Sequence, residues 1–146
     1  MYQSGYNRPM KLIPRTAQKI LKKLAGSYPA LVVTGPRQSG KTTLTQAVFP
    51  DKPYVSLEEL DTRKFAQEDP RGFLNQYADG AILDEVQRVP QIFSYLQGVV
   101  DKSNRPGQFI LSGTQMLMLG VIGEYLWRTL DVARGREPYV IERIYE

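Results

Sequence analysis

Short apolar runs alternate along this chain with longer stretches in which apolar residues recur at helical spacing. A continuous apolar run of a few residues predicts a strand that is buried on both faces, as in a parallel sheet covered by helices. Such runs fall at about 30–34, 54–57, 81–83 and 109–111. The stretches between them predict helices over about 14–25, 41–49, 58–67, 70–77 and 90–101. We therefore expect an α/β protein with a doubly wound, mainly parallel sheet.

Composition limits the chemistry that this chain can perform. The 146 residues, 42% of them hydrophobic, suffice for one domain with a real core. There is no cysteine and no histidine, which excludes disulfides, thiolate metal sites, histidine-ligated metals and catalytic triads that contain histidine. Acid–base work must fall to carboxylates, lysine or tyrosine. The lack of cysteine and of a secretory-signal pattern favours a reducing cytoplasm as the location.

The charge is distributed unevenly. The net charge is +4, but residues 1–50 carry eight basic and no acidic residues, so that residues 51–146 sum to −4. A basic N-terminal third is compatible with nucleic-acid binding. We favour a solvated helix face instead, because no aromatic ladder and no DNA-reading motif accompanies the charge.

Residues 35–42 match the phosphate-binding loop pattern G-x-x-x-x-G-K-[ST] without a mismatch, between a predicted strand and a predicted helix. Glycines let such a loop curl so that its N–H groups and the helix N-terminus face an anion. We expect the side chain of Lys41 to reach the β- and γ-phosphates, where it would take part in catalysis, and the hydroxyl of Thr42 to lie on Mg²⁺. The predicted nucleotide-binding residues are Gly35, Pro36, Arg37, Gln38, Ser39, Gly40, Lys41, Thr42 and Thr43.

A pair of carboxylates follows the third apolar run. Asp84 and Glu85 come directly after Ile82 and Leu83, and ligands of such folds gather at the carboxyl ends of parallel strands. We expect Asp84 to hold Mg²⁺ and Glu85 to orient or activate the attacking water. The alternative interpretation is a strand end whose acids only cap the next turn.

Polar residues also end the fourth apolar run, at Ser112 and Thr114. On a strand beside that of the phosphate-binding loop, they are expected to sense the γ-phosphate; the alternative is an ordinary strand-end turn. Other nucleotide-binding classes fit less well. Gln87 stands where a GTPase would have the glycine of D-x-x-G, no N-K-x-D motif is present, and an ABC-type signature would have to precede Asp84.

Taken together, these motifs resemble a family of prokaryotic AAA-type ATPases. The similarity runs from about residue 11 to 115 and includes Ile13-Pro14-Arg15, the 35–42 loop, Tyr54–Leu57, Asp69-Pro70, Ile82–Gln87 and Arg105–Gln115. It implies an AAA-type P-loop NTPase fold, a three-layer α/β sandwich with a mainly parallel central sheet. It also implies ATP binding and Mg²⁺-dependent hydrolysis. Members of the family usually continue into a further C-terminal domain.

The pattern changes after Gln115. Over about 28 residues, including Leu119-Gly120-Val121-Ile122-Gly123-Glu124-Tyr125-Leu126, the chain is similar to the C-terminal end of membrane-bound polyprenyl-phosphate glycosyltransferases. The apolar run at 116–123 is far shorter than the ~20 residues that span a bilayer, so membrane contact is not favoured. We expect a helix over about 116–134 and an edge strand over 139–141. The helix would cover the sheet or present an apolar surface to a partner or a membrane interface.

The sequence thus predicts three segments: a lead-in at 1–13, an ATPase core at 14–115 that is truncated at its C-terminus, and an appended tail at 116–146. No arginine finger can be assigned among Arg88, Arg105 and Arg128, and such a residue accelerates hydrolysis by about 10³–10⁵-fold. Hydrolysis is therefore expected to be slow, or to depend on a protein partner or a second copy of the chain. The alternatives are a non-hydrolysing, nucleotide-gated interaction module and a vestigial fragment.

Overall fold

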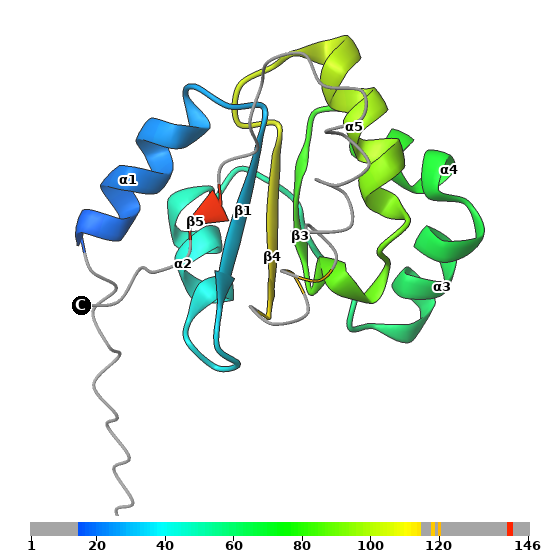
Figure 1. Cartoon of the computed structure of the whole chain (residues 1–146), viewed down its shortest axis with the longest axis horizontal. Helices are drawn as coiled ribbons and strands as arrows, with labels where there is room; N and C mark the ends of the chain where they lie inside the picture. The colour runs from blue at the N-terminus through cyan, green and yellow to red at the C-terminus, as the bar shows by residue number, and fades with distance from the viewer. Residues whose placement is uncertain (1–14, 115–117, 119, 121–139, 142–146) are drawn as a thin grey trace, which may run out of the picture.

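The computed structural model describes residues 15–114, 118, 120 and 140–141, which build a five-stranded sheet with helices on both faces (Figure 1). The strand order is β2-β3-β4-β1-β5, and every neighbouring pair is parallel. The strands are β1 (Ala30–Gly35), β2 (Tyr54–Ser56), β3 (Ala81–Asp84), β4 (Phe109–Thr114) and β5 (Val140–Ile141). The predicted α/β fold with a mainly parallel sheet is confirmed.

Helices form the two outer layers of the predicted three-layer sandwich. In Figure 1, α1 and α2 lie on one side of the sheet, and α3, α4 and α5 on the other. The helices are α1 (Arg15–Ala25), α2 (Lys41–Val48), α3 (Leu60–Glu68), α4 (Pro70–Asn75) and α5 (Ile92–Ser103), with a short 3₁₀ helix, η1 (Val86–Arg88), after β3. Asp69 begins α4 as expected, because its side chain accepts a hydrogen bond from the backbone N–H of Gly72.

Successive residues of the central strands pack on opposite faces of the sheet, which is why their sequences are continuously apolar. In β1, Leu31 and Val33 pack with α1 and α2, whereas Val32 packs with the helices of the other face. Ile82 of β3 and Ile110 of β4 join the first cluster, and their neighbours join the second. Each such side chain, when fully buried, stabilises the fold by about 1.5–3 kcal/mol.

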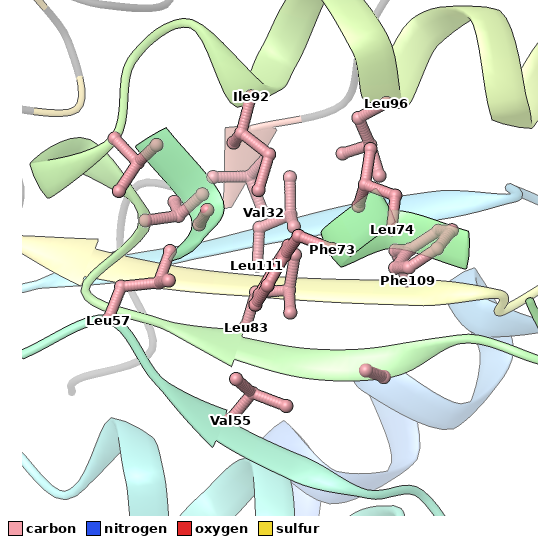
Figure 2. Close-up of a cluster of buried hydrophobic side chains, with 14 of the residues drawn as sticks. Val32, Val55, Leu57, Phe73, Leu74, Leu83, Ile92, Leu96, Phe109 and Leu111 are labelled. Carbon is pink, nitrogen blue, oxygen red and sulfur yellow. The ribbon is translucent and has the colours of Figure 1, made fainter. Parts of the chain in front are cut away.

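The larger cluster, shown in Figure 2, lies between the sheet and α3, α4 and α5. Phe73 of α4 sits in its interior and makes edge-on ring contacts with Phe65 and Tyr77, with centroids 5.8 and 5.3 Å apart. Ile92 and Leu96 of α5 join the same cluster, so α4 and α5 both pack against the sheet. The loop between β3 and α5, which carries part of the candidate site, is thereby held at both ends.

Several helix boundaries differ from those predicted by apolar spacing; α3, for example, begins at Leu60 rather than 58. Helix α5 begins at Ile92 rather than 90, because the N–H groups of Phe93 and Ser94 donate to carbonyls three residues back. Helix α4 ends at Asn75, and Tyr77 bonds in the same manner to Leu74. These are 3₁₀-type turns, and they keep apolar residues near the helical spacing. Periodicity therefore does not reveal where the α-helix stops.

The end of the chain supplies the predicted edge strand in part. Val140 and Ile141 pair in parallel with Val32 and Val33 of β1. The helix expected over 116–134 lies outside the described residues, except that Met118 and Gly120 have helical conformation and Met118 is buried. The predicted lead-in at 1–13 also lies outside them. Within the described residues, no helix has the length and apolarity needed to cross a membrane.

Candidate functional site

Four parallel strands end at one edge of the sheet, and the candidate site lies there. In the observed register, Gly35 at the end of β1 pairs with Thr114 at the end of β4, and Ser56 at the end of β2 pairs with Asp84 at the end of β3. Because β1 continues into the 35–40 loop and then α2, the loop lies over the same edge. The fold thereby brings together segments that are distant in the sequence.

The loop at 35–40 curls through backbone conformations that favour glycine. Gly40 has a φ of 85°, in the left-handed region, and it caps the N-terminus of α2. An added Cβ at Gly40 would meet nothing within 4 Å, so the constraint is the backbone angle and not space. Gln38 adopts a φ of 58° in the same region. The first N–H groups of α2 have no carbonyl partner within the helix, and they start where the loop ends.

The loop wraps around its own lysine. The Lys41 side chain is 8% exposed, and its Nζ donates to the carbonyls of Gly35 and Pro36 at 3.0 and 2.6 Å and to Ser39 Oγ at 3.4 Å. Burial lowers the pKa of Lys41, and the charges of Glu85 and Asp84 oppose that shift. An entering phosphate would therefore meet an ammonium group that is already held in place and would compete with the carbonyls for its protons.

Asp84 is the centre of the polar contacts at this edge. Its Oδ1 accepts hydrogen bonds from Ser112 Oγ at 2.5 Å and from the Glu85 N–H at 3.1 Å. Its Oδ2 accepts from Thr42 Oγ1 at 2.8 Å and Tyr54 Oη at 2.7 Å. Burial alone would raise the pKa of Asp84, but these four donors outweigh it, so the pKa lies below its usual value. The Asp84 side chain is thus held as an oriented carboxylate.

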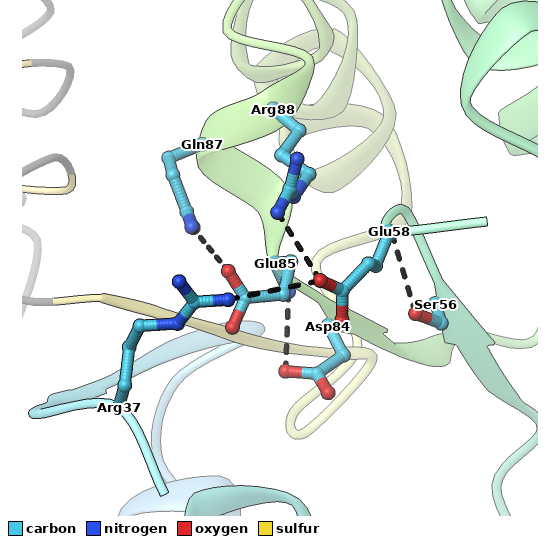
Figure 3. A network of polar contacts seen from close by, with 7 residues as sticks. All are labelled: Arg37, Ser56, Glu58, Asp84, Glu85, Gln87 and Arg88. Carbon is cyan, nitrogen blue, oxygen red and sulfur yellow. Dashed lines mark hydrogen bonds and ion pairs between the residues drawn. The ribbon is translucent and has the colours of Figure 1, made fainter. Parts of the chain in front are cut away.

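Glu85 stands just past the end of β3 in an unusual backbone conformation. Its φ is 56°, which lies in the left-handed region, and η1 begins directly after it. Figure 3 shows the side-chain amide of Gln87 donating to the Glu85 carboxylate, with Nε2 and Oε2 2.5 Å apart. Non-glycine residues in this conformation are uncommon and are enriched at functional sites.

A small group of ions lies at the rim of the site. Glu58, after β2, accepts a hydrogen bond from Arg88 at 3.2 Å and forms an ion pair with Arg37 of the loop at 3.9 Å (Figure 3). Arg37 and Glu58 are exposed and Arg88 is half-buried, so each pair stabilises the fold by at most about 1 kcal/mol. The rim group nevertheless places two arginines from different segments beside the loop and β3.

The predicted site residues are brought together in most cases. Lys41, Thr42, Asp84 and Ser112 meet in the contacts described above, and Thr114 ends the strand beside Gly35. The arginine candidates differ from one another. Arg88 lies at the rim, Arg128 lies outside the described residues, and Arg105 bonds to Asp79 and the carbonyl of Ala78 before β3, at the opposite edge of the sheet. Within one chain, Arg105 cannot serve this site.

Two contacting residues were not expected at the site from the sequence. Tyr54 was assigned only to a strand, and Gln87 only to the segment after Asp84. The side chain of Tyr54 shares a face of β2 with that of Ser56, whose partner is Asp84. The alternation of β2 could therefore have indicated Tyr54 once that strand was placed beside β3. No comparable signal exists for Gln87, because its position depends on the unpredicted turn of η1.

The oxygen atoms of Thr42 and Asp84 suit a magnesium ion that arrives with a phosphate. Both are hard oxygen donors, and Mg²⁺ takes one or two protein ligands while keeping water and phosphate oxygens for the rest. The described residues contain no group of three or more His, Cys, Asp or Glu side chains that could hold a metal on their own. The oxygens of Thr42 and Asp84 could thus serve beside water and phosphate oxygens as ligands of Mg²⁺.

Residues 27–129 match the AAA domain family, well over half of the 146-residue chain. The chain belongs to the AAA domain family. The match extends past residue 115, the predicted end of the core, and that boundary stays a prediction. Uncharacterized proteins of Mycobacterium tuberculosis and Mycobacterium bovis are each 32% identical in a 103-residue alignment that covers 68% of this chain and 23% of each relative. The chain thus spans about a quarter of their length.

Solved structures show the same fold. AMPPCP-bound DnaA from Aquifex aeolicus has a TM-score of 0.55 at 21% identity, with 87% of this chain and 44% of that chain covered. The Aeropyrum pernix ORC2 protein, solved as ADPNP–ADP complexes, has a TM-score of 0.55 at 15% identity over 94% of this chain and 50% of its own. A Walker-type ATPase of Pyrococcus abyssi has a TM-score of 0.54 at 16% identity over 86% and 51%. These similarities show the fold of P-loop AAA proteins.

Proposed function

We propose that this AAA domain binds ATP with Mg²⁺ at the 35–43 loop and hydrolyses the bond between its β- and γ-phosphates. The observation that carries the proposal is the 2.8 Å hydrogen bond between Thr42 and Asp84, which joins the phosphate-binding loop to the end of β3. Membership of the AAA domain family supports it. Two similar structures support it as well: by their names, one is bound to AMPPCP and the other is a complex with ADPNP and ADP.

Each residue of the loop has a role in this proposal. The N–H groups at the start of α2 bind phosphate oxygens, aided by the positive end of the helix dipole. Lys41 supplies a buried positive charge to the β- and γ-phosphates, where negative charge shifts as the bond breaks. Thr42 and Asp84 would hold Mg²⁺, which supplies charge neutralisation on the phosphates when bound. Ser112 and Thr114, at the end of β4, would sense the γ-phosphate, Ser112 through its hydrogen bond to Asp84.

Glu85 performs the acid–base step. Its carboxylate orients a water molecule and accepts the proton that the water loses as its oxygen bonds to the γ-phosphorus. The bond from the γ-phosphorus to the bridging oxygen breaks, and ADP and inorganic phosphate leave. Since the chain has no histidine, a carboxylate is the residue type best suited to this step near neutral pH.

Turnover by the isolated chain is expected to be slow. Among the described residues, Arg37 and Arg88 lie at the rim and are both paired with Glu58. In this proposal a partner protein or a second copy of the chain supplies an arginine to the γ-phosphate, for which a rate gain of about 10³–10⁵-fold is typical. A phosphate-release rate per chain that rises with protein concentration would support self-association.

Glu85→Gln tests hydrolysis separately from binding. This variant keeps the hydrogen-bonding shape of the side chain but cannot accept the proton, so it should bind Mg-ATP with wild-type affinity and release phosphate at least about 10²-fold more slowly. Equal turnover in both proteins would remove Glu85 from its proposed role. Mg-ATP binding by the wild type without any phosphate release would instead favour the non-hydrolysing interaction module.

The vestigial alternative makes a different prediction. A ligand that binds only the folded state raises its stability, by about 2.7 kcal/mol at a hundred times the dissociation constant. Mg-ATP should therefore raise the melting temperature of the wild type. An unchanged melting temperature at millimolar Mg-ATP would favour a fragment that has lost its site.

A further inference from the structure

The side chain of Gln87 connects Glu85 to the end of β4. One end of its amide donates to Glu85, with Nε2 and Oε2 2.5 Å apart. The other end, Oε1, lies so near Gly113 that a Cβ added to that glycine would be 2.1 Å from it. A carboxylate only accepts hydrogen bonds, so the nitrogen of the amide must face Glu85 and the oxygen must face Gly113.

This arrangement is not one that folding alone would favour. Gln87 is only 8% exposed, and its Oε1 is buried with no hydrogen-bond partner among the described residues. A buried acceptor without a donor lowers stability. An unbranched apolar side chain such as methionine would fill the same space without that cost. The polarity of Gln87 is therefore explained by its contact with Glu85.

The end of β4 is connected to both carboxylates of the site, directly to Asp84 and through Gln87 to Glu85. Ser112 donates directly to Asp84, and Gly113, the next residue, packs against the amide that holds Glu85. A displacement of this strand end would consequently act on the metal-binding carboxylate and on the water-orienting carboxylate together. The absence of a side chain at Gly113 is what allows the second contact.

We propose that Gln87 is a positioning residue, which fixes the orientation of the Glu85 carboxylate and makes it depend on the end of β4. The proposal rests on the proposed ATP hydrolysis. A glutamate side chain has three rotatable bonds, and the hydrogen bond from Gln87 restricts them. The opposing effect of Glu85 on the lowered pKa of Lys41 agrees with a carboxylate that is held on the side of the phosphate-binding loop.

Gln87→Met is the variant that tests the proposal. It keeps the length and burial of the side chain and removes only the hydrogen bond and the unpartnered oxygen. We expect kcat for phosphate release to fall by roughly tenfold or more, with KM for Mg-ATP within about twofold of wild type and no drop in melting temperature. The matched control is Gln91→Met, at an exposed glutamine four residues later, which should leave kcat unchanged.

The same substitution in a Glu85→Gln background shows whether Gln87 acts through Glu85. If it does, the double variant releases phosphate no more slowly than Glu85→Gln alone. If Gln87→Met lowers kcat for phosphate release in the Glu85→Gln background as much as it does in the wild type, the proposal is overturned. A kcat for Gln87→Met equal to that of the wild type would overturn it as well. A wild-type chain that binds Mg-ATP but releases no phosphate would instead refute the proposed hydrolysis, and this inference with it.

A second variant covers the case in which Gln87→Met fails to fold. Gln87→Leu is also apolar and of similar size, and like methionine it cannot donate a hydrogen bond to Glu85. Its kcat for phosphate release should fall as for Gln87→Met, with KM for Mg-ATP within about twofold of wild type. A kcat equal to that of wild type in a folded Gln87→Leu protein would contradict the role of Gln87.

Discussion

Thr42 Oγ1 lies 2.8 Å from Asp84 Oδ2 and donates a hydrogen bond to it, although 42 positions separate the two residues in the sequence. Thr42 belongs to the first turn of α2, which follows β1, and Asp84 ends β3, with β4 between those two strands. The contact therefore depends on the order of the strands and not on local sequence. It brings together the hydroxyl and the carboxylate that we propose to hold Mg²⁺.

Removing the Thr42 hydroxyl should weaken the binding of Mg-ATP specifically. Thr42→Ala is expected to lower the affinity for Mg-ATP by about tenfold, which corresponds to about 1.4 kcal/mol, because the metal loses a ligand. Titration calorimetry with ATP and EDTA should show little difference between variant and wild type. Thr42→Ser keeps the hydroxyl and should restore the Mg²⁺ dependence. If Ser and Ala variants bind Mg-ATP alike, Thr42 has no role toward the metal.

Asp84 should make the free energy of unfolding depend on pH in the acidic range. Its pKa in the fold is below the unfolded value of about 3.9, so its charged form contributes stability above that value, and the contribution is lost as pH falls through the folded pKa. Asp84→Asn should destabilise the protein by about 1–3 kcal/mol at neutral pH. Urea unfolding from pH 7 to 3 should show this difference shrinking at the acidic end. If the difference in the free energy of unfolding between wild type and Asp84→Asn is the same at every pH, Asp84 is not held as a carboxylate by its four hydrogen bonds.

The sequence predicts the loop and the carboxylate pair because each is a local pattern with a local cause. Glycines at 35 and 40 set the turn, and an apolar run sets the strand that carries Asp84. Tyr54 and Gln87 are different. Their contacts with Asp84 and Glu85 depend on the β2–β3 register and on the turn of η1. Neither contact can be predicted from local sequence alone, because each depends on where another segment lies.

The phenol of Tyr54 should lose its proton at a higher pH than an ordinary tyrosine. Burial and the hydrogen bond to that carboxylate raise the pKa of Tyr54 to about 12. The phenolate absorbance of wild type minus that of Tyr54→Phe isolates this residue from the other tyrosines, and its midpoint should lie near pH 12. The raised pKa also means that its contribution to stability is present below about pH 10 and lost as pH rises toward 12. A midpoint near 10 would show that the contact with Asp84 is absent in solution.

A side chain at Gly113 should displace that of Gln87. An added Cβ would lie 2.1 Å from Gln87 Oε1 and 2.8 Å from Met118 Cγ. Since both belong to flexible side chains that can shift, Gly113→Ala should destabilise the fold by about 1 kcal/mol and slow turnover by moving the Gln87 amide. Gly98→Ala is the matched control, since a Cβ there meets nothing within 4 Å inside α5. That substitution should stabilise the protein by about 0.5–1 kcal/mol. Urea midpoints at constant m-value measure both changes; equal effects would contradict the close approach at Gly113.

The binding of Mg-ATP at Lys41 is the claim on which the rest depends, and titration calorimetry of wild type against Lys41→Met tests it most directly. Methionine keeps most of the buried alkyl chain and removes the ammonium group, and far-ultraviolet circular dichroism would check that the variant is folded. We expect the wild type to bind Mg-ATP and the folded variant to bind at least about tenfold more weakly. Equal affinity in the two proteins, or no binding by the wild type, would contradict a nucleotide site at the phosphate-binding loop.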